Sequence, residues 1–258
     1  MFINTISESK SKTFNQCGLK YKFKYINRLE ETASNTDALH FGSFIHKILE
    51  DGVEATSIED LYIIADRIKK DYRFSKAHEK KIDTCLRNFL RFNASLEEVG
   101  STEMVYEVIV DEKYDIKFNG IIDRTIKGKE GGYLIIDYKT SKRESTKFDL
   151  YSDHQLQGYA YAIHKKFKVP IEKIVAAHYY PVSNNFVTVK YSVPQIAQYV
   201  RSKKEEIWRI RKMKSCEFQP SENRFCNWCG YKGICSLFTE PHVITENMKN
   251  TKTKKRRK

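Results

Sequence analysis

The stretch from Gly120 to Lys142, GIIDRTIKGKEGGYLIIDYKTSK, carries the residues best suited to chemistry. It joins two apolar segments through a glycine-rich connection. Each segment ends in charged residues: Asp123 closes the first, and Asp137 with Lys139 closes the second. Two carboxylates and a lysine at the ends of neighbouring strands can bind a divalent metal ion that holds a nucleophilic water beside a phosphate. This pattern predicts phosphodiester hydrolysis.

Each aspartate alone can also be interpreted as half of a surface ion pair. Asp123 would pair with Arg124 or a neighbouring lysine, and Asp137 with Lys139, because residues two apart on a strand share a face. However, burial disfavours an ionised carboxylate, so apolar strands that end in aspartate need a counter-charge. A lysine or a divalent cation can supply it, and the alternatives stay open for either residue by itself.

Charge and composition indicate the class of partner. The chain has 258 residues with a net charge of +13, from 46 Lys and Arg against 33 Asp and Glu, which favours a polyanion such as nucleic acid. Residues 246–258 are rich in lysine and arginine, and we expect a disordered basic tail there. A composition of 40% hydrophobic and 31% charged residues with five prolines is typical of a globular protein.

The hydropathy of the sequence indicates that it has no membrane-spanning segment. The apolar runs are short and interrupted, and the segment MFINTISESKSK lacks the apolar core of a secretory signal. We therefore expect no membrane partner and a cytoplasmic protein, with a nuclear or host-cell location left open. No G-x4-G-K-[ST] motif is present, so any nucleotide-driven motor would belong to a partner such as a helicase.

Three cysteines form a C-x2-C-x5-C cluster: Cys226, Cys229 and Cys235. In a reducing compartment such a cluster favours a metal site over a disulfide framework. The spacing leaves the fourth ligand open among Cys17, Cys216 and His242. Taken alone, it indicates zinc, the commonest structural metal in cysteine-rich knuckles.

Apolar periodicity predicts the elements that must position these groups. Helices are expected over residues 36–51, 58–74, 78–98, 154–167 and 194–214. Strands are expected as two alternating runs within 103–126, a third over 133–140, and two more at 172–181 and 185–193. The run 133–140 is apolar on both faces, which is typical of a central strand. The order of these elements predicts a mixed α/β layer.

Two of the expected helices carry polar pairs one turn apart. Within 36–51, Gly42, His46 and Glu50 recur every fourth residue and so lie on one stripe of the helix. Within 154–167, Gln155 and Tyr159 have the same spacing. Such pairs are common on helix surfaces, so neither is specific by itself.

The set as a whole resembles the RecB-like branch of the PD-(D/E)XK nucleases. The resemblance rests on Gly42-x3-His46, G-I-I-D-R ending at Arg124, I-I-D-Y-K-T from Ile135 to Thr140, and Gln155-x3-Tyr159. The three C-terminal cysteines, with one far upstream, resemble the iron–sulfur members of this branch, which include CRISPR-associated nucleases and the nuclease part of AddB. The resemblance spans residues 17–235.

The resemblance implies a role for each matching residue. It implies metal ligands at His46, Asp123, Asp137 and the main-chain carbonyl of Tyr138, with Mg²⁺ or Mn²⁺ as the metal. It further implies catalytic roles for Asp123, Asp137, Lys139, Gln155 and Tyr159. Lys139 would orient the attacking water, while Gln155 and Tyr159 would hold the site and the DNA backbone. Asp123 follows Ile122 instead of the proline that names the superfamily, and Glu50 fits only loosely.

For the cysteines, the family order implies a [4Fe-4S] cluster held by Cys17, Cys226, Cys229 and Cys235, with Zn²⁺ as the alternative. Such a site would tie together the two ends of the chain. The neighbouring aromatic residues could stack on a single strand or shield the cluster, and we expect shielding. These residues are Phe225, Trp228 and Tyr231.

These expectations combine into one prediction. The fold is a restriction-endonuclease-like core with a central mixed sheet flanked by helices, an N-terminal helical block and a C-terminal metal-cluster lobe. One nuclease domain would span 1–245, with a helical insertion at about 54–98 and a cysteine lobe at about 215–240. The predicted function is a metal-dependent DNA exonuclease on single strands or ends, in repair, recombination or replication. The alternatives are a structure-selective endonuclease and a non-catalytic DNA-binding subunit.

Overall fold

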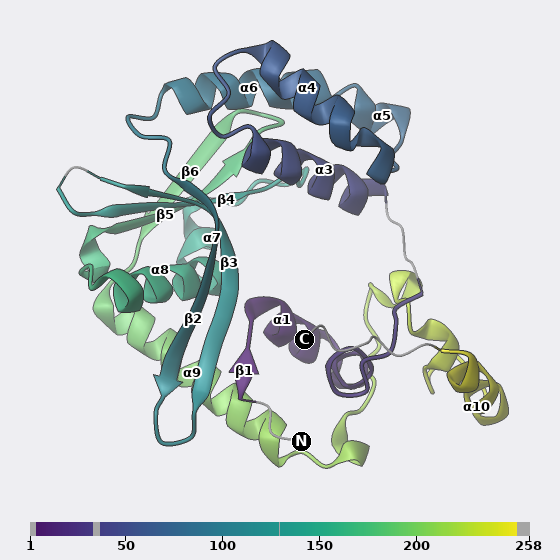
Figure 1. Ribbon diagram of the computed structural model, residues 1–258. Helices are drawn as coiled ribbons and strands as arrows, with labels where there is room; N and C mark the ends of the chain where they lie inside the picture. The colour runs from purple at the N-terminus through teal and green to yellow at the C-terminus, as the bar shows by residue number, and fades with distance from the viewer. Residues whose placement is uncertain (1–3, 33–36, 129, 252–258) are drawn as a thin grey trace. The chain divides into compact units, whose positions relative to one another are not determined.

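The computed structural model describes residues 4–32, 37–128 and 130–251. The chain divides into two compact units. The larger unit comprises Thr36–Lys203, and the smaller comprises Met1–Asn35 with Lys204–Lys258. The boundary falls within helix α9 (Val193–Lys212). Figure 1 labels the elements of both units.

A mixed sheet forms the centre of the larger unit. Its strands are β2 (Ser101–Asp111), β3 (Ile116–Lys127), β4 (Tyr133–Tyr138), β5 (Ile174–Tyr180) and β6 (Asn185–Lys190). Their order is β2-β3-β4-β5-β6, and every neighbouring pair is antiparallel except β4 and β5, which are parallel. A parallel pair needs a crossover connection, which α8 (His154–Phe167) supplies between β4 and β5. The predicted α/β class is confirmed.

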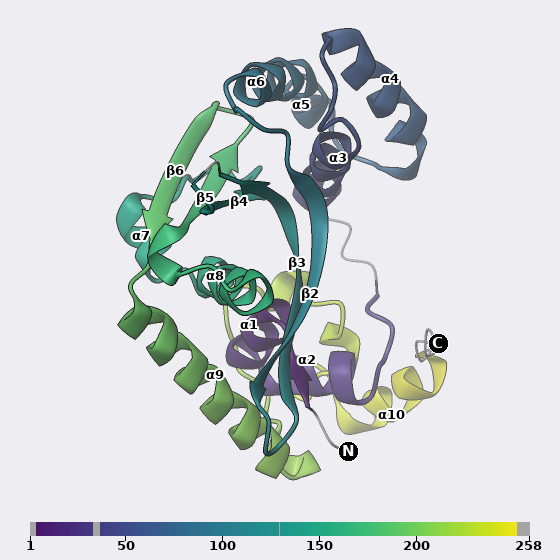
Figure 2. The same cartoon turned by 60° about the vertical axis from the view of Figure 1, so that its left-hand side comes forward.

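Helices cover both faces of this sheet. One face carries α3 (Asp37–Asp51), α4 (Ile58–Ile68), the 3₁₀ turn η2 (Lys69–Asp71), α5 (Lys76–Glu79) and α6 (Ile82–Ala94). These helices bury their apolar faces against Ile126, Ile136, Tyr138 and Tyr179 of the sheet. Figure 2 shows α8 on the opposite face. Since side chains alternate along a strand, Ile135 and Asp137 of β4 face α8 while Ile136 and Tyr138 face the helical block.

The expected helices 58–74 and 78–98 are shorter in the structure. Helix α4 tightens into η2, and Tyr72 then takes an extended conformation. Tyr72 and Phe74 pack against Phe44 of α3, with ring centroids 5.4 and 5.1 Å away. Packing of these two aromatic rings replaces the helix that periodicity predicts. The remaining short elements of this unit are α7 (Lys147–Tyr151) and η3 (Ile171–Lys173).

The smaller unit consists of the C-terminal part of α9 and of short elements from both ends of the chain. The N-terminal ones are β1 (Thr5–Ile6), α1 (Glu8–Gln16), α2 (Gly18–Tyr21) and the π-helical turn η1 (Lys22–Ile26). The C-terminal ones are η4 (Ser215–Glu217), η5 (Cys226–Trp228), η6 (Lys232–Ile234) and α10 (Pro241–Asn250). A small apolar cluster of Phe23, Leu29, Tyr231 and Ile234 joins the two segments.

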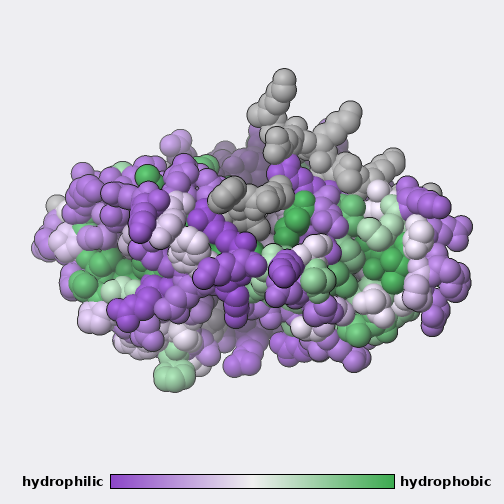
Figure 3. Space-filling view, turned by 90° about the horizontal axis from the view of Figure 1, so that it is seen from below, coloured by the Kyte–Doolittle hydropathy of each residue, from purple (hydrophilic) through white to green (hydrophobic). Residues whose placement is uncertain are grey.

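The C-terminal segment differs from the prediction. We expected disorder over 246–258, but α10 continues through Asn250, and residues 252–258 lie outside the described part of the chain. The surface seen in Figure 3 is mostly hydrophilic, with small apolar areas between polar ones. Within the described residues, no helix has the length and apolar character needed to cross a membrane.

Candidate active site and cysteine site

The predicted active-site residues gather at one cleft of about 550 Å³ in the larger unit. Its lining includes His46 of α3, Asp123 of β3, Asp137 and Tyr138 of β4, Lys139, and Gln155 of α8. Tyr159 is buried and contacts Gln155. Glu50, which fits the resemblance only loosely, does not line the cleft and pairs with Lys47 at 2.8 Å.

The end of the β3–β4 ladder places the two carboxylates together. The last paired residues are Arg124 and Ile136, so Asp123 and Asp137 stand where the next pair would form. There the ladder opens, and the main-chain N–H of Tyr138 donates to Asp123 Oδ2 at 2.8 Å. Asp137 is 1% exposed, and Lys139 Nζ lies 2.5 Å from its Oδ2. Two acidic groups and one lysine therefore share this site, with Asp137 buried and the side chains of Asp123 and Lys139 15% and 29% exposed.

Burial and mutual repulsion dominate the electrostatics. Burial, and then the charge of Asp137, raise the pKa of Asp123 well above the ordinary carboxyl range, although the Tyr138 N–H opposes this. Burial also disfavours the charged form of Lys139, but Asp137 outweighs it and the pKa of Lys139 is raised. The carboxylates therefore need more positive charge than Lys139 alone supplies.

Helix α3 brings His46 to this place. Burial lowers the pKa of His46, which keeps the imidazole neutral and able to bind a metal ion. Its Nδ1 lies 3.5 Å from Asp123 Oδ2. The charge of Asp137 opposes this lowering of the His46 pKa in part. The His46 ring also lies edge-on to the Tyr138 ring, with ring centroids 5.9 Å apart. A Cβ on Gly42 would lie 3.0 Å from Thr140 Oγ1, so a glycine permits the close approach of α3.

Helix α8 contributes the polar pair. Asp153 caps its N-terminus, since Asp153 Oδ1 accepts from the N–H groups of Gln155 at 2.8 Å and Leu156 at 3.0 Å. Gln155 Nε2 donates to Asp137 Oδ1 at 3.0 Å and to the hydroxyl of Tyr159 at 2.7 Å. This pair thus fixes the orientation of the Asp137 carboxylate.

Sequence reasoning missed His178 of β5. It is 1% exposed and pairs in register with Asp137 across the parallel ladder. Its Nε2 lies 3.7 Å from Asp137 Oδ2 and 3.7 Å from Asp153 Oδ2, between the carboxylate of β4 and the cap of α8. The available signal was a single histidine inside the mainly apolar run IVAAHYY. The parallel pairing that brings it beside Asp137 is not visible in sequence.

The donor set suits a hard divalent cation. Among the described residues, no group of three or more His, Cys, Asp or Glu side chains converges closely enough to hold a metal ion as the side chains stand. However, His46, Asp123 and Asp137 line the same cleft, and two carboxylates with a neutral imidazole can bind Mg²⁺ or Mn²⁺. The raised pKa of Asp123 also favours a cation at this place, because a positive charge would offset the repulsion between Asp123 and Asp137.

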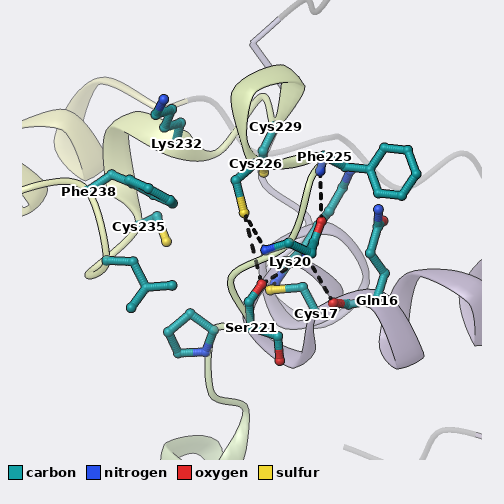
Figure 4. Close-up of a pocket in the computed structure, with 13 residues that line it drawn as sticks. Gln16, Cys17, Lys20, Ser221, Phe225, Cys226, Cys229, Lys232, Cys235 and Phe238 are labelled. Atoms are coloured by element: carbon teal, nitrogen blue, oxygen red, sulfur yellow. Dashed lines mark hydrogen bonds between the residues drawn. The ribbon is translucent and has the colours of Figure 1, made fainter.

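The cysteines line a separate pocket within the smaller unit. Its lining includes Cys17, Cys226, Cys229 and Cys235, and Figure 4 shows these four side chains around one space. Cys216 is exposed and His242 is absent from the lining, so of the three possible fourth ligands the structure brings Cys17 to the others. Burial raises the pKa of Cys235, and Cys17, Cys229 and Cys226 add to the effect.

Main-chain groups support the sulfurs. Cys17 caps α2, and its Sγ accepts from the N–H of Lys20 at 3.4 Å. Cys226 Sγ accepts from the N–H of Asn223 at 3.3 Å. Amide donors to sulfur stabilise thiolates, which are the form that binds a metal. Tyr231 is buried, whereas Phe225 and Trp228 are 47% and 58% exposed, so only Tyr231 has the shielded position we expected.

Comparisons with known proteins concern the family and the fold. A family model for the PD-(D/E)XK nuclease superfamily matches residues 5–236. One component of the ATP-dependent helicase/deoxyribonuclease of Streptococcus agalactiae serotype Ia is 29% identical over 162 residues, which cover 56% of this chain and 14% of that protein. The protein of the same name from Streptococcus uberis is 27% identical over 161 residues, covering 57% and 14%. This chain thus spans about a seventh of the length of these relatives.

A solved structure has the same fold. The protein from Eubacterium rectale named "Putative exonuclease" superposes with a TM-score of 0.54 at 17% identity, covering 88% of this chain and 87% of that chain. At this identity the likeness concerns the fold alone. It agrees with the mixed sheet and flanking helices described above.

Proposed function

Because the matching family model covers residues 5–236, this chain belongs to the PD-(D/E)XK nuclease superfamily, and we propose that it is a metal-dependent DNA nuclease acting as an exonuclease on single strands or DNA ends. The observation that carries the proposal is the pair of carboxylates, Asp123 and Asp137, with Lys139 at the open end of the β3–β4 ladder. The fold and the site geometry support hydrolysis of a phosphodiester bond.

The proposed metal ligands are Asp123, Asp137, His46 and the carbonyl of Tyr138. A bound Mg²⁺ or Mn²⁺ would supply a water of lowered pKa and neutralise charge on the scissile phosphate. Asp123 is held for this role by the Tyr138 N–H, and Asp137 by Gln155. Both carboxylates are thus oriented before any substrate arrives.

Lys139 is proposed to orient the attacking water and to stabilise the charge that grows on the phosphate. Its ion pair with Asp137 keeps the ammonium at the site, and its raised pKa keeps it charged. Tyr159 acts through Gln155, because its hydroxyl accepts from the same amide that donates to Asp137. Tyr159 is therefore a positioning residue.

The choice of DNA and the need for a partner draw on the relatives. The streptococcal proteins are named as one component of a helicase/deoxyribonuclease, and this chain covers only a small part of them. We propose that this chain acts with a helicase or another repair or recombination protein. A non-catalytic subunit is the rival, but it gives no reason for Asp123, Asp137 and Lys139 to meet in one cleft.

The test is cleavage of end-labelled linear DNA and of circular DNA, each single- and double-stranded, with Mg²⁺, with Mn²⁺ or with EDTA. We expect metal-dependent loss of linear substrate and no loss of closed circles. Asp123→Ala, Asp137→Ala and Lys139→Ala should each lower the rate by at least about a hundredfold while DNA binding persists.

Three outcomes separate the alternatives. Cleavage of circles would replace the exonuclease with an endonuclease. A parent protein that binds DNA but cuts nothing would favour the non-catalytic role. If Asp137→Ala degraded DNA at the parent rate, the site assignment would be wrong.

We also propose that Cys17, Cys226, Cys229 and Cys235 hold a [4Fe-4S] cluster, with Zn²⁺ as the alternative. Their shared pocket and the amide donors to two of the sulfurs support a metal site. Four thiolates satisfy either metal, so geometry alone does not choose between them. A single nuclease domain over 1–245 and a cytoplasmic location remain part of this proposal.

A further inference from the structure

A second polar group lines the same cleft as the aspartates. It consists of His78 of α5 and Lys81 at the N-cap of α6. Both belong to the helical block between α3 and β2. Neither lies in a motif that carries the family resemblance, and neither takes part in the proposed hydrolysis.

His78 is held in a fixed orientation. Its Nδ1 lies 2.7 Å from Asp37 Oδ2, and its ring stacks on Phe41 at 4.6 Å with an interplanar angle of 22°. The hydroxyl of Ser75 donates to the same Asp37 oxygen at 2.7 Å, and the Ser75 main-chain N–H also donates to this carboxylate. Because these contacts already fix the ring, a ligand that binds it loses little of the usual ordering entropy.

His78 lines the cleft, and the contacts of its ring with Asp37 and Ser75 use Nδ1. Since Nδ1 contacts Asp37, Nε2 is the atom left for a ligand. An imidazolium has a donor on each nitrogen, so it can satisfy Asp37 and an anion at once. The carboxylate of Asp37 lies where it would balance that positive charge.

Lys81 provides a second cation at the cleft. It is exposed, and within the described ranges it makes no ion pair. Two other basic residues of the block are paired: Lys69 with Glu79, and Arg87 with Asp83 at 2.9 Å. A lysine ammonium is a mobile point charge with three donors, which suits a phosphate oxygen.

We propose that His78 and Lys81 form a second phosphate-binding site, which holds a backbone phosphate of the substrate strand away from the scissile bond. This inference rests on the proposed function, because it assumes that a nucleic-acid strand enters the cleft. The ligand class is a phosphodiester backbone: a cleft of about 550 Å³ lined by Lys81, Lys139 and Lys142 can take several groups of a strand. Backbone contacts position a strand and do not read its sequence.

The first test measures binding without cleavage. A fluorescein-labelled single-stranded oligonucleotide is titrated with protein carrying Asp137→Ala, in EDTA, over a range of salt concentrations. Adding Lys81→Gln should weaken binding about threefold to tenfold. It should also lower the slope of log affinity against log salt by about 0.7, the value for one phosphate contact on a single strand. His78→Gln should weaken binding to a similar extent.

Lys80→Gln is the matched control. Lys80 is the exposed neighbour of Lys81 with the same charge, and it does not line the cleft. It should leave affinity and salt slope near those of the parent. If Lys81→Gln and His78→Gln bind like Lys80→Gln, the second phosphate site does not exist. Lys81 is on the surface, so its variant remains informative even if His78→Gln lowers stability.

A cleavage assay with protein that retains Asp137 separates this inference from the proposed function. Lys81→Gln should raise KM and leave kcat within about twofold, because the proposed contact is to a phosphate other than the scissile one. If the parent cleaves no DNA but Lys81→Gln still weakens binding, the proposed function fails and the phosphate site stands. If the parent cleaves and Lys81→Gln matches Lys80→Gln in KM and affinity, only the phosphate site fails.

Discussion

Among single residues, the carboxylate of Asp123 illustrates the conflict within the candidate active site. Burial and Asp137 both disfavour its ionised form, while one amide donor and Lys139 favour it. A cation bound beside Asp123 would favour the ionised form of its carboxyl group. The carboxylate whose ionised form is disfavoured is therefore one of the proposed metal ligands.

This balance predicts a pH dependence of stability. The pKa of Asp123 is raised, so above the ordinary carboxyl pKa of about 3.9 the folded protein binds a proton that the unfolded chain has lost. The free energy of unfolding therefore falls as the pH rises through this interval, up to the raised pKa. In EDTA at pH 8, the free energy of unfolding of Asp123→Asn should exceed that of the parent by at least about 1 kcal/mol. A pKa shift of less than one unit is enough for this difference. At pH 4 this difference should vanish.

Urea denaturation at several pH values checks this prediction. The comparison isolates Asp123, because His46 has a lowered pKa and adds a dependence of opposite sign below about pH 6.5 in both proteins. Asp66→Asn, on the exposed side of α4, is the control and should keep the parent profile. A parent that gains stability toward pH 8 relative to Asp123→Asn would contradict the raised pKa.

His178 is the second residue whose role can be tested. It lies 3.7 Å from both Asp137 and Asp153, so its loss should let the Asp137 carboxylate turn away from the proposed ligand position. We expect His178→Val to weaken Mn²⁺ binding, measured by calorimetry, about tenfold or more, as loss of an orienting partner does elsewhere. His178→Gln keeps a donor and should recover part of the affinity. Equal weakening by both substitutions would instead indicate a packing role.

Among the elements, helix α8 affects both the stability of the fold and the geometry of the candidate active site. Its cap, Asp153, satisfies two main-chain donors and fixes the turn that carries Gln155. Asp153→Ala should cost about 1 kcal/mol of unfolding free energy and lower the cleavage rate, because Gln155 then loses its fixed position beside Asp137. Asp153→Ser retains a capping oxygen and should restore most of the stability.

Ser57→Ala separates the two effects. Ser57 caps α4 with the same kind of contact, accepting from the N–H of Asp60 at 3.2 Å, but it does not line the cleft. Its substitution should cost a similar free energy in urea denaturation and leave cleavage unchanged. If Asp153→Ala lost stability but kept its full cleavage rate, Gln155 would not depend on the cap.

The elements also show which parts of the fold can be predicted from the sequence. The helix predicted over 154–167 has these bounds in the structure, because its apolar stripe and polar termini are local signals. The strands holding Asp123 and Asp137 are predictable from their period for the same reason. The extended conformation at residues 72–74 is not, because Tyr72 and Phe74 leave the predicted helix to pack on Phe44. Such packing depends on contacts distant in sequence, as does the pairing of His178 with Asp137.

For the whole molecule, the two units differ in the size of their apolar cores. The larger unit has an extended apolar core that reaches from α3 to β5. Fewer apolar residues are buried in the described part of the smaller unit. They include the cluster of Phe23, Leu29, Tyr231 and Ile234, together with Ile6, Tyr21, Ile207, Ile210 and Phe218. Small cores usually need a metal or a disulfide, and the cysteines of this chain are free. The smaller unit should therefore depend on the proposed metal at its cysteine pocket.

Substitution of one cysteine tests that dependence. Protein purified without oxygen should be brown with broad visible absorbance, and Cys17→Ser should bleach it and expose the smaller unit to proteolysis. Cys216→Ser is the control, because Cys216 is exposed and outside the pocket, and it should keep the colour. A colourless protein with stoichiometric zinc would exclude the iron–sulfur cluster and keep the structural role. A protein with neither metal, whose Cys17→Ser form resists protease like the parent, would exclude both, because the four thiols would then stabilise nothing beyond their own packing.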